Sequence, residues 1–306
     1  MSGNGDGCPV LVGYDGSVAA DQALRWAVEE AQLRDLPLTV CHAWQWPYSL
    51  AAPDEDTLEI LRGAGAVVAD EGVRKAHAIV ADAGVRRARA LATRLEVRWC
   101  LERGSASSVL LQASRDATLI VLGARGHGGF EGLTVGSTAA QVAAHASRPV
   151  IVVRPTPSAE RPAARIVVGV DGSPASQAAL GFTFQEAELR DASVTAVCGW
   201  WDPAALPSPD RAPFIDAERV RHEAITKFEQ AVTPWRDEYP KVAVDAKFVV
   251  DTPRHALANA AKDAALLVVG DRGIGSTPQA LLGPVPQFLL AQATCSVAIV
   301  PAHQPW

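Results

Sequence analysis

An internal repeat constrains the fold of this 306-residue chain more than any other feature of its sequence. The segment Val12–Ser17 recurs as Val168–Ser173 at an offset of 156 residues. Three glycines late in the first copy recur at an offset of 147: Gly123, Gly126 and Gly136 match Gly270, Gly273 and Gly283. The repeated unit of about 150 residues has the size of a domain and is too long for a solenoid repeat.

Proline and polar residues separate the two copies. Residues 155–163 contain Pro155, Pro157 and Pro162, which predicts a short, stiff linker. We therefore expect domain 1 at residues 1–154 and domain 2 at residues 164–306.

Each copy alternates short apolar runs with helical patterns. The strands expected in the first copy are residues 10–13, 38–44, 95–101, 118–122 and 149–153. The expected helices begin after an N-cap at Ser17, cover 58–93 with Gly63–Gly65 or Gly84 as places for a break, cover 106–114, and begin again after Gly136. Continuous apolar strands are buried on both faces, as in a parallel sheet between two helical layers. The prediction is α/β: two doubly wound domains, each with a five-stranded parallel sheet flanked by helices.

The composition of the chain excludes several classes of partner and location. Apolar residues make up 48% of the chain, enough for a core in each copy, and no apolar run approaches the ~20 residues of a membrane span. The polar, glycine-rich start of the chain does not resemble a secretion signal, so we expect a cytoplasmic protein. The net charge of −6 is spread along the chain and predicts no binding to nucleic acid.

The five cysteines are Cys8, Cys41, Cys100, Cys198 and Cys295. Their number is odd and none has CxxC spacing, so the sequence indicates neither a disulfide framework nor a zinc site. Four of them lie in or beside apolar runs, which favours small core residues over reactive thiols.

The glycine-rich loop that begins at Gly123 is the strongest candidate for a binding site. It follows a buried strand and precedes a helix, and glycines in such a loop let a ligand approach the backbone. The amides at the start of the helix then attract an anion. Gly123, Gly126, Gly136 and Ser137 therefore predict a phosphate cradle, to which Thr138 adds a second hydroxyl. The spacing differs from both a Walker A loop and a dinucleotide fingerprint.

Most of the other candidate residues have two possible interpretations. Asp15 suits either a ligand-binding carboxylate or an Asx turn before the Ser17 cap. Arg125 and His127 lie in the glycine loop and either reach phosphate or face solvent. Trp44 and its neighbours after the second strand stack on an adenine ring or, more simply, pack in the protein. His145, near a helix end, fits a carbonyl cap.

The second copy of the loop lacks donors that the first one has. Pro284 replaces Ser137, and proline has neither an N–H nor a hydroxyl. Asp271 replaces Ala124 and adds a negative charge. Proline suits the first turn of a helix, so the fold survives there. The prediction is that domain 2 binds nucleotide poorly or not at all.

With these motifs assembled, the chain resembles a tandem universal stress protein of the ATP-binding branch. The resemblance rests on Val12–Ser17, on the G-x-x-G-(nine)-G-S loop and on the segment 145–154. It implies ATP with Mg²⁺, held by Gly13, Tyr14, Asp15, Ala43, Gly123, Ala124, Arg125, Gly126, His127, Gly136, Ser137 and Thr138. It also implies a regulatory stress-response role, an unknown regulatory protein partner, and homodimerisation through pairing of the last strands.

Two other classes of function stay open. One is a slow ATPase or an ATP-dependent enzyme of related fold, although no catalytic residue stands out and the pyrophosphate loop of such adenylating enzymes is absent. The other is a structural module in which neither copy binds nucleotide.

Overall fold

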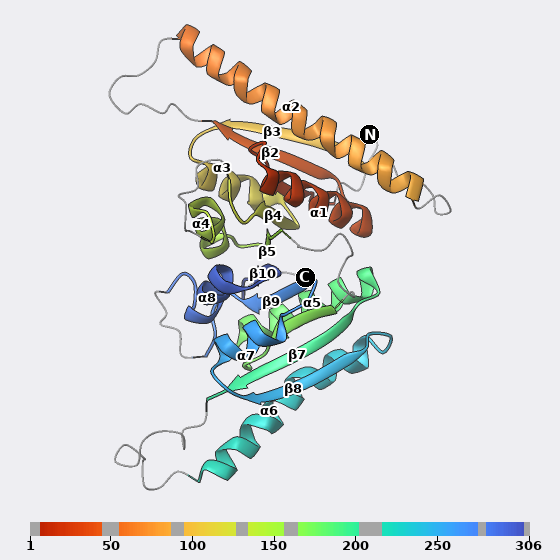
Figure 1. Cartoon of the computed structure of the whole chain (residues 1–306), viewed down its shortest axis with the longest axis vertical. Coiled ribbons are helices and arrows are strands. Elements are labelled where there is room, and N and C mark those ends of the chain that lie inside the picture. Colours follow the sequence, from red (N-terminus) through yellow and green to blue (C-terminus); the bar gives the residue numbers. More distant parts are fainter. Residues whose placement is uncertain are drawn as a thin grey trace, which may run out of the picture. The chain divides into compact units, whose positions relative to one another are not determined.

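The computed structural model describes residues 7–44, 55–86, 95–126, 134–155, 165–201, 216–274 and 280–302. The chain divides into two compact units, Met1–Pro155 and Thr156–Trp306. Both units alternate strands with helices, as Figure 1 shows.

The first unit is a parallel sheet whose strand order is β3-β2-β1-β4-β5. Its strands are β1 (Val10–Gly13), β2 (Leu38–Trp44), β3 (Val97–Arg103), β4 (Leu119–Gly123) and β5 (Val150–Val153). Its helices are α1 (Val18–Arg34), α2 (Glu55–Arg86), α3 (Ala106–Ala113) and α4 (Ser137–His145), with a 3₁₀ turn at Ser114–Asp116. Helices α1 and α2 pack against each other, and so do α3 and α4, which gives a helical layer on each face.

The second unit repeats this arrangement with the order β8-β7-β6-β9-β10, again all parallel. Its strands are β6 (Arg165–Gly169), β7 (Ser193–Trp200), β8 (Val244–Val250), β9 (Leu266–Gly270) and β10 (Ser296–Val300). Its helices are α5 (Pro174–Arg190), α6 (Ala217–Glu238), α7 (Pro253–Ala260) and α8 (Pro284–Gln292). The predicted class, two doubly wound α/β domains with parallel sheets, is confirmed.

The helix after each first strand begins as its sequence predicts. Ser17 caps α1 by accepting a 3.1 Å hydrogen bond from the Ala20 amide. Ser173 caps α5 in the same way, and Pro174 follows as the first helical residue. Both caps satisfy an amide that would otherwise lack a partner, which stabilises each helix by about 1 kcal/mol.

Helix α2 shows where the sequence prediction was wrong. It runs unbroken from Glu55 to Arg86, so neither Gly63–Gly65 nor Gly84 interrupts it. The predicted continuation to residue 93 lies outside the described residues. A Cβ at Gly72 would lie 2.7 Å from Tyr14 and 2.8 Å from Val40. Packing of a flat helix surface against the sheet has therefore outweighed the low helix propensity of glycine.

The central strands form the core of each unit. Val10, Leu11 and Val12 are at most 1% exposed in β1, and Ile166, Val167 and Val168 are equally buried in β6. Burying each such side chain stabilises the fold by about 1.5–3 kcal/mol. Because both faces of these strands are covered, the sheet holds the ends of its strands, and the residues that follow them, in fixed positions.

Candidate functional site

A pocket of about 210 Å³ lies at the carboxyl ends of β1, β2 and β4 in the first unit. Strands β1 and β4 are neighbours in the sheet, but the chain passes from β1 to β2 and β3 on one side before it crosses to β4 on the other side. The order of the strands therefore reverses at this place. Such reversal points open a crevice between the loops, and doubly wound sheets bind their ligands there.

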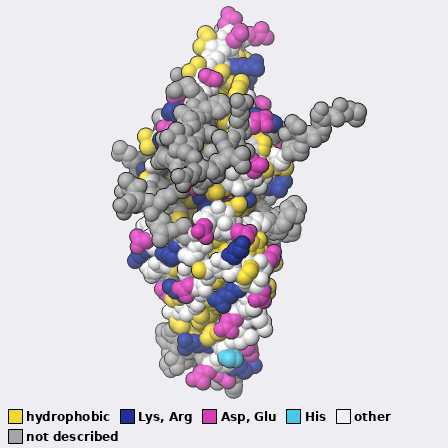
Figure 2. All heavy atoms as spheres, turned by 90° about the vertical axis from the view of Figure 1, so that its right-hand side faces the viewer, with side chains coloured by type: hydrophobic (Ala, Val, Ile, Leu, Met, Phe, Trp, Pro, Cys, Tyr) yellow, Lys and Arg dark blue, Asp and Glu magenta, His cyan; other side chains and the backbone are white. Residues whose placement is uncertain are grey.

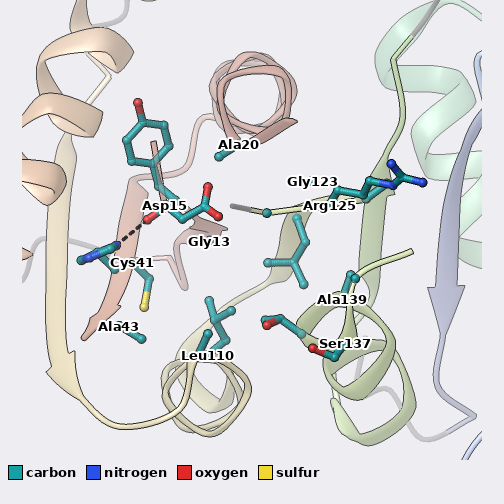
Figure 3. A pocket seen from close by; sticks show the side chains of 18 residues that line it. Gly13, Asp15, Ala20, Cys41, Ala43, Leu110, Gly123, Arg125, Ser137 and Ala139 are labelled. Atoms are coloured by element: carbon teal, nitrogen blue, oxygen red, sulfur yellow. Dashed lines mark hydrogen bonds between the residues drawn. The ribbon is translucent and has the colours of Figure 1, made fainter. Parts of the chain in front are cut away.

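The pocket collects most of the predicted site residues. Its walls include Gly13, Tyr14, Asp15, Ala43, Gly123, Ala124, Arg125, Gly126, Gly136, Ser137 and Thr138. His127 lies outside the described residues. Figure 3 shows Asp15 and Ser137 on opposite sides of the pocket, and Cys41 and Leu110 also line it.

The structure supports one of the two interpretations of Asp15, the Asx turn. Its Oδ1 accepts a 3.0 Å hydrogen bond from the Ser17 amide, which is the Asx turn expected before α1. Its Oδ2 faces Gly126, where an added Cβ would collide with that oxygen. The carboxylate therefore organises both the start of α1 and the first bend of the glycine loop.

Gly123 has a structural reason to be glycine. A Cβ at this position would lie 2.7 Å from the carbonyl oxygen of Ala19 and 2.8 Å from its carbonyl carbon. The end of β4 thus passes directly beneath the first turn of α1. This close approach of two backbones requires glycine whether or not a ligand binds.

Gly136 differs from the two earlier glycines. It is the N-cap residue of α4 with no side-chain cap bond, and the nearest described atom to an added Cβ would be 3.6 Å away. Contact with the described part of the chain therefore does not force this position to be glycine. The start of α4 faces the pocket through Gly136, Ser137 and Thr138, with the amides of its first turn available to an anion.

Tyr14 contributes its backbone to the pocket and turns its side chain away. The hydroxyl donates a 2.9 Å hydrogen bond to Asp21, whose carboxylate also receives a 3.0 Å bond from Lys75 of α2. Burial raises the pKa of the Tyr14 phenol, an effect that the hydrogen bond from Lys75 opposes. The carbonyl of Tyr14 accepts a 2.8 Å bond from His42 Nδ1, so the tautomer with a proton on Nδ1 fits this contact.

Sequence reasoning missed the apolar wall. Leu110 of α3 and Leu122 of β4 line the pocket together with Ala20, Ala106 and Ala139. A Cβ at Gly13 would lie 2.6 Å from Leu122 and 3.3 Å from Leu110, so the two leucines press against the end of β1. The available signal was the position of the 106–114 helix, which follows a strand end at the same sheet edge. A flat apolar surface beside polar loops suits an aromatic ring.

The corresponding edge of the second unit keeps the loop geometry. Asp171 Oδ1 accepts a 2.9 Å bond from the Ser173 amide, and a Cβ at Gly273 would collide with Asp171 Oδ2. Gly270 passes beneath Ala175 as Gly123 passes beneath Ala19. The pair Gly123 and Gly270 and the pair Gly126 and Gly273 therefore each have one structural cause in both units.

The chemistry of that second edge is different. Pro284 is the first residue of α8 after Gly283, the place that Ser137 occupies in α4. Asp271 holds a carboxylate that is 13% exposed, 3.3 Å from Arg272 Nε, with Oδ1 buried and without a hydrogen-bond partner among the described residues. An incoming anion would meet a proline and a carboxylate in place of Ser137 and Ala124.

Trp44 and His145 do not belong to the pocket lining, whereas Arg125 does. Trp44 faces α2, because a Cβ added at Gly65 of that helix would lie 3.5 Å from the Cβ of Trp44. The Arg125 side chain is exposed and extends away from the pocket in Figure 3. His145 lies 2.8 Å from the carbonyl of Gln141, in keeping with its expected role at the end of α4.

Charges of both signs are mixed on the face drawn in Figure 2, where the coloured Lys and Arg side chains are interspersed with Asp and Glu. No helix within the described ranges is long and apolar enough to cross a membrane. Nor do the described His, Cys, Asp and Glu side chains form a group of three or more that could hold a metal ion.

Two tandem α/β units, each with a glycine loop before its fourth helix, define the class of protein, and comparison with known proteins agrees. The model of the Universal stress protein family matches residues 9–154 and again residues 163–301. A universal stress protein from Mycolicibacterium smegmatis is 30% identical over 303 residues, which cover 95% of this chain and 96% of that protein. The chain belongs to the universal stress protein family.

A solved structure that matches nearly the whole chain shares the fold. The crystal structure of a universal stress protein from Archaeoglobus fulgidus matches 96% of this chain and 98% of its own, with a TM-score of 0.68 and 15% identity. Another structure from that organism, a universal stress protein in complex with dAMP, matches 49% of this chain and 99% of its own, with 27% identity and a TM-score of 0.33.

Proposed function

We propose that the first unit binds ATP with Mg²⁺ and that the chain is a nucleotide-dependent regulator of the stress response. The observation that carries the proposal is the gathering of Asp15, the glycine loop and the start of α4 around one pocket. The two loops come from distant parts of the sequence, yet both line the same crevice. A nucleotide offers groups that suit each wall.

The polar end of the pocket fits phosphates. Gly136, Ser137 and Thr138 place the first turn of α4 against it, and the N-cap has no side-chain bond that would occupy the amides. The partial positive charge of a helix start adds attraction for an anion. In this proposal Ser137 supplies both its amide and its hydroxyl to the phosphates.

The apolar end of the pocket fits the base. Leu110 and Leu122 offer flat surface, and Ala43 near the end of β2 belongs to the same wall. In this proposal the backbone of Gly13, Tyr14 and Ala43 contacts the adenine and ribose. Gly123 and Gly126 shape the loop, and Ala124, Arg125 and His127 complete the predicted contact set.

Magnesium fits this site only as a partner of the phosphates. The described side chains do not form a metal cluster by themselves, and Asp15 is the acidic residue of the pocket wall. The ion would neutralise phosphate charge when bound, while Asp15 would hold its hydration water.

In this proposal the second unit has a structural role and does not supply a second nucleotide site. Pro284 removes two donors and Asp271 adds a carboxylate, so binding at that edge is expected to be weak or absent. Hydrolysis of ATP is expected to be slow at most. The proposal includes a cytoplasmic location, a homodimer formed through the last strands and an unknown regulatory protein partner.

Calorimetric titration of the full chain with Mg·ATP tests the proposal. We expect one ATP per chain, and chromatography of the reaction should show little ADP after many hours. A stoichiometry of two would contradict the predicted inactivity of the second unit. No heat and no thermal shift would favour a structural module, and rapid multiple turnover would favour an enzyme.

A further inference from the structure

Two cysteines of the first unit lie directly opposite each other on neighbouring strands. In the parallel register of β2 and β3, Cys41 pairs with Cys100. Neighbouring strands lie about 4.8 Å apart, within the range of Cα separations that a disulfide spans. The corresponding pair in the second unit is Val197 and Lys247, so this pairing of cysteines belongs to the first unit.

Both side chains project from the same face of the sheet. Their neighbours His42 and Leu101 face α2, since both lie within 3.6 Å of a Cβ added at Gly65. Side chains alternate along a strand, so Cys41 and Cys100 point to the opposite face. Both cysteines are free thiols in this structure.

The two sulfurs differ in their surroundings. Cys41 is 2% exposed and lines the pocket, whereas Cys100 is half-buried in the edge strand β3. A hydrogen bond from the Cys41 thiol lowers the pKa of Cys100, an effect that burial and Glu102 oppose. The same hydrogen bond, followed by burial, raises the pKa of Cys41. Cys100 is thus the sulfur that an oxidant in solution reaches first, and Cys41 is its sheltered neighbour.

We propose that Cys41 and Cys100 form a reversible dithiol–disulfide site that is oxidised by hydroperoxides. Cys100 is the sulfur that meets the oxidant, and Cys41 is the sulfur that resolves the product. The interpretation of the cysteines as small core side chains then applies to Cys295, which is buried, but not to this pair.

The oxidation balances in two steps. The Cys100 thiolate attacks one peroxide oxygen, an S–O bond forms, the O–O bond breaks, and the leaving hydroxide takes a proton to become water. The Cys41 sulfur then attacks the sulfenic sulfur, an S–S bond forms, the S–O bond breaks, and the departing hydroxide takes the Cys41 proton. Two thiols lose two electrons and two protons in all, and one hydrogen peroxide becomes two waters.

The disulfide would also change the nucleotide pocket, a consequence that rests on the proposed function. Cys41 belongs to the pocket wall, and its carbonyl accepts a 2.9 Å hydrogen bond from the Tyr14 amide. Forming the S–S bond draws the Cys41 side chain toward β3 and away from its present place in the wall. We expect the oxidised chain to bind ATP more weakly, by about fivefold or more, the lower end of ordinary coupling between sites.

Mass spectrometry of the folded full chain after treatment with hydrogen peroxide tests the site. The intact mass should fall by two hydrogen atoms, and a reductant should restore it. After blocking of free thiols and trypsin digestion, one linked pair of peptides should appear, covering residues 35–62 and 99–103. The variant C198S is the matched control, because Cys198 lies in the second unit and burial raises its pKa to about 11.

Three results would overturn the site: no loss of mass, a disulfide that involves another cysteine, or Cys100 oxidised to sulfinic acid while Cys41 stays a thiol. The variant C41S should lose the disulfide and leave a Cys100 sulfenic acid that dimedone traps. Circular dichroism of C41S and C100S checks that each folds. If C41S does not fold, C100S still has to abolish the linked peptides.

Titration of the reduced and oxidised chains with Mg·ATP separates this inference from the proposed function. A disulfide with unchanged ATP affinity would overturn the link to the pocket and leave the oxidation site standing. A disulfide in a chain that binds ATP in neither state would overturn the proposed function alone.

Discussion

The starts of α4 and α8 are the most instructive contrast in the molecule. Both helices begin directly after a glycine that ends the loop, and both lead to the last strand of their unit. One begins with Ser137 and the other with Pro284. Because proline fits the first turn of a helix, the fold is unchanged while the amide and hydroxyl donors vanish. The architecture of a loop and its ability to bind an anion can therefore be lost separately.

The shared glycines teach a related lesson. Gly123 and Gly270 allow a strand end to pass beneath a helix, and Gly126 and Gly273 make room for an aspartate. These causes act in both units. Their spacing reports the shape of the loop, whereas Ser137 in place of Pro284 distinguishes the loop proposed to bind phosphate.

The largest expected effect comes from copying the second unit into the first with Ser137→Pro. The variant should fold, as α8 does with Pro284, and lose two hydrogen bonds to a charged ligand. At about 1.5–3 kcal/mol for each bond, affinity for Mg·ATP should fall about a hundredfold or more. Calorimetry measures the change, and Pro284→Ser is the control that should leave the first site unaltered. Unchanged affinity in Ser137→Pro would remove α4 from the proposed site.

Gly123→Ala and Gly270→Ala should reduce stability by similar amounts. Each new methyl group would press on the backbone of Ala19 or Ala175 and cost about 1–3 kcal/mol of unfolding free energy in its own unit. Hydrogen exchange resolved by peptide in a urea series measures each unit separately. A loss in the first unit with none in the second would mean that the two close approaches are not equivalent.

Gly126→Ala and Gly273→Ala should differ in their effect on ATP. Both place a Cβ against an aspartate that shapes its loop, so both should strain the fold. Only the change at Gly126 lies in the proposed site, and we expect it to weaken ATP binding about tenfold, or ~1.4 kcal/mol. Titration of both variants decides. An equal loss of affinity would indicate that the second loop also contributes to binding.

Asp21→Gln should have the smallest effect. It introduces the residue type found at the corresponding Gln177 and removes the carboxylate charge that pairs with Lys75 and accepts from Tyr14. The Lys75 and Asp21 side chains are 34% and 36% exposed, so the loss should be about 0.5–1 kcal/mol of unfolding free energy. Urea unfolding measures it, with Gln177→Asn as the control.

The contribution of Lys75 depends on pH with a definite sign. Hydrogen bonds with Tyr14 and Asp21 raise the pKa of Lys75 above its ordinary value. The stabilisation is therefore complete below about pH 10.4, the ordinary lysine pKa, and disappears as the pH rises through the higher folded-state value. The stability difference between wild type and Asp21→Gln should shrink over that range. A constant difference would show that another contact of Asp21 is responsible.

Much of the fold followed from local patterns in the sequence. The strands at 10–13 and 38–44 and the Ser17 cap lie where they were expected, because buried parallel strands and capped helices leave clear local signals. The register of the strands and the packing of the helices leave no such local signals. The unbroken α2 depends on contacts of Gly72 with Tyr14 and Val40, and the pairing of Cys41 with Cys100 depends on how two strands align.

The candidate site was predictable for a similar reason and to a similar extent. Glycines and Asp15 follow strand ends, and strand ends meet at one edge of a parallel sheet. The apolar wall escaped prediction because Leu110 and Leu122 look like ordinary core residues in the sequence. Their place beside Gly13 is a property of the assembled layers.

The contact between Asp171 and its loop keeps the second unit close, in structure, to a loop that could bind an anion. Asp171 still accepts a 2.9 Å hydrogen bond from the Ile274 amide, so the loop is held in shape by the protein itself. Under the proposed asymmetry, a gain of binding there requires new donors and the loss of one carboxylate, and the loop itself can stay as it is. The double substitution Asp271→Ala with Pro284→Ser is then expected to give the second unit a nucleotide-binding site of its own.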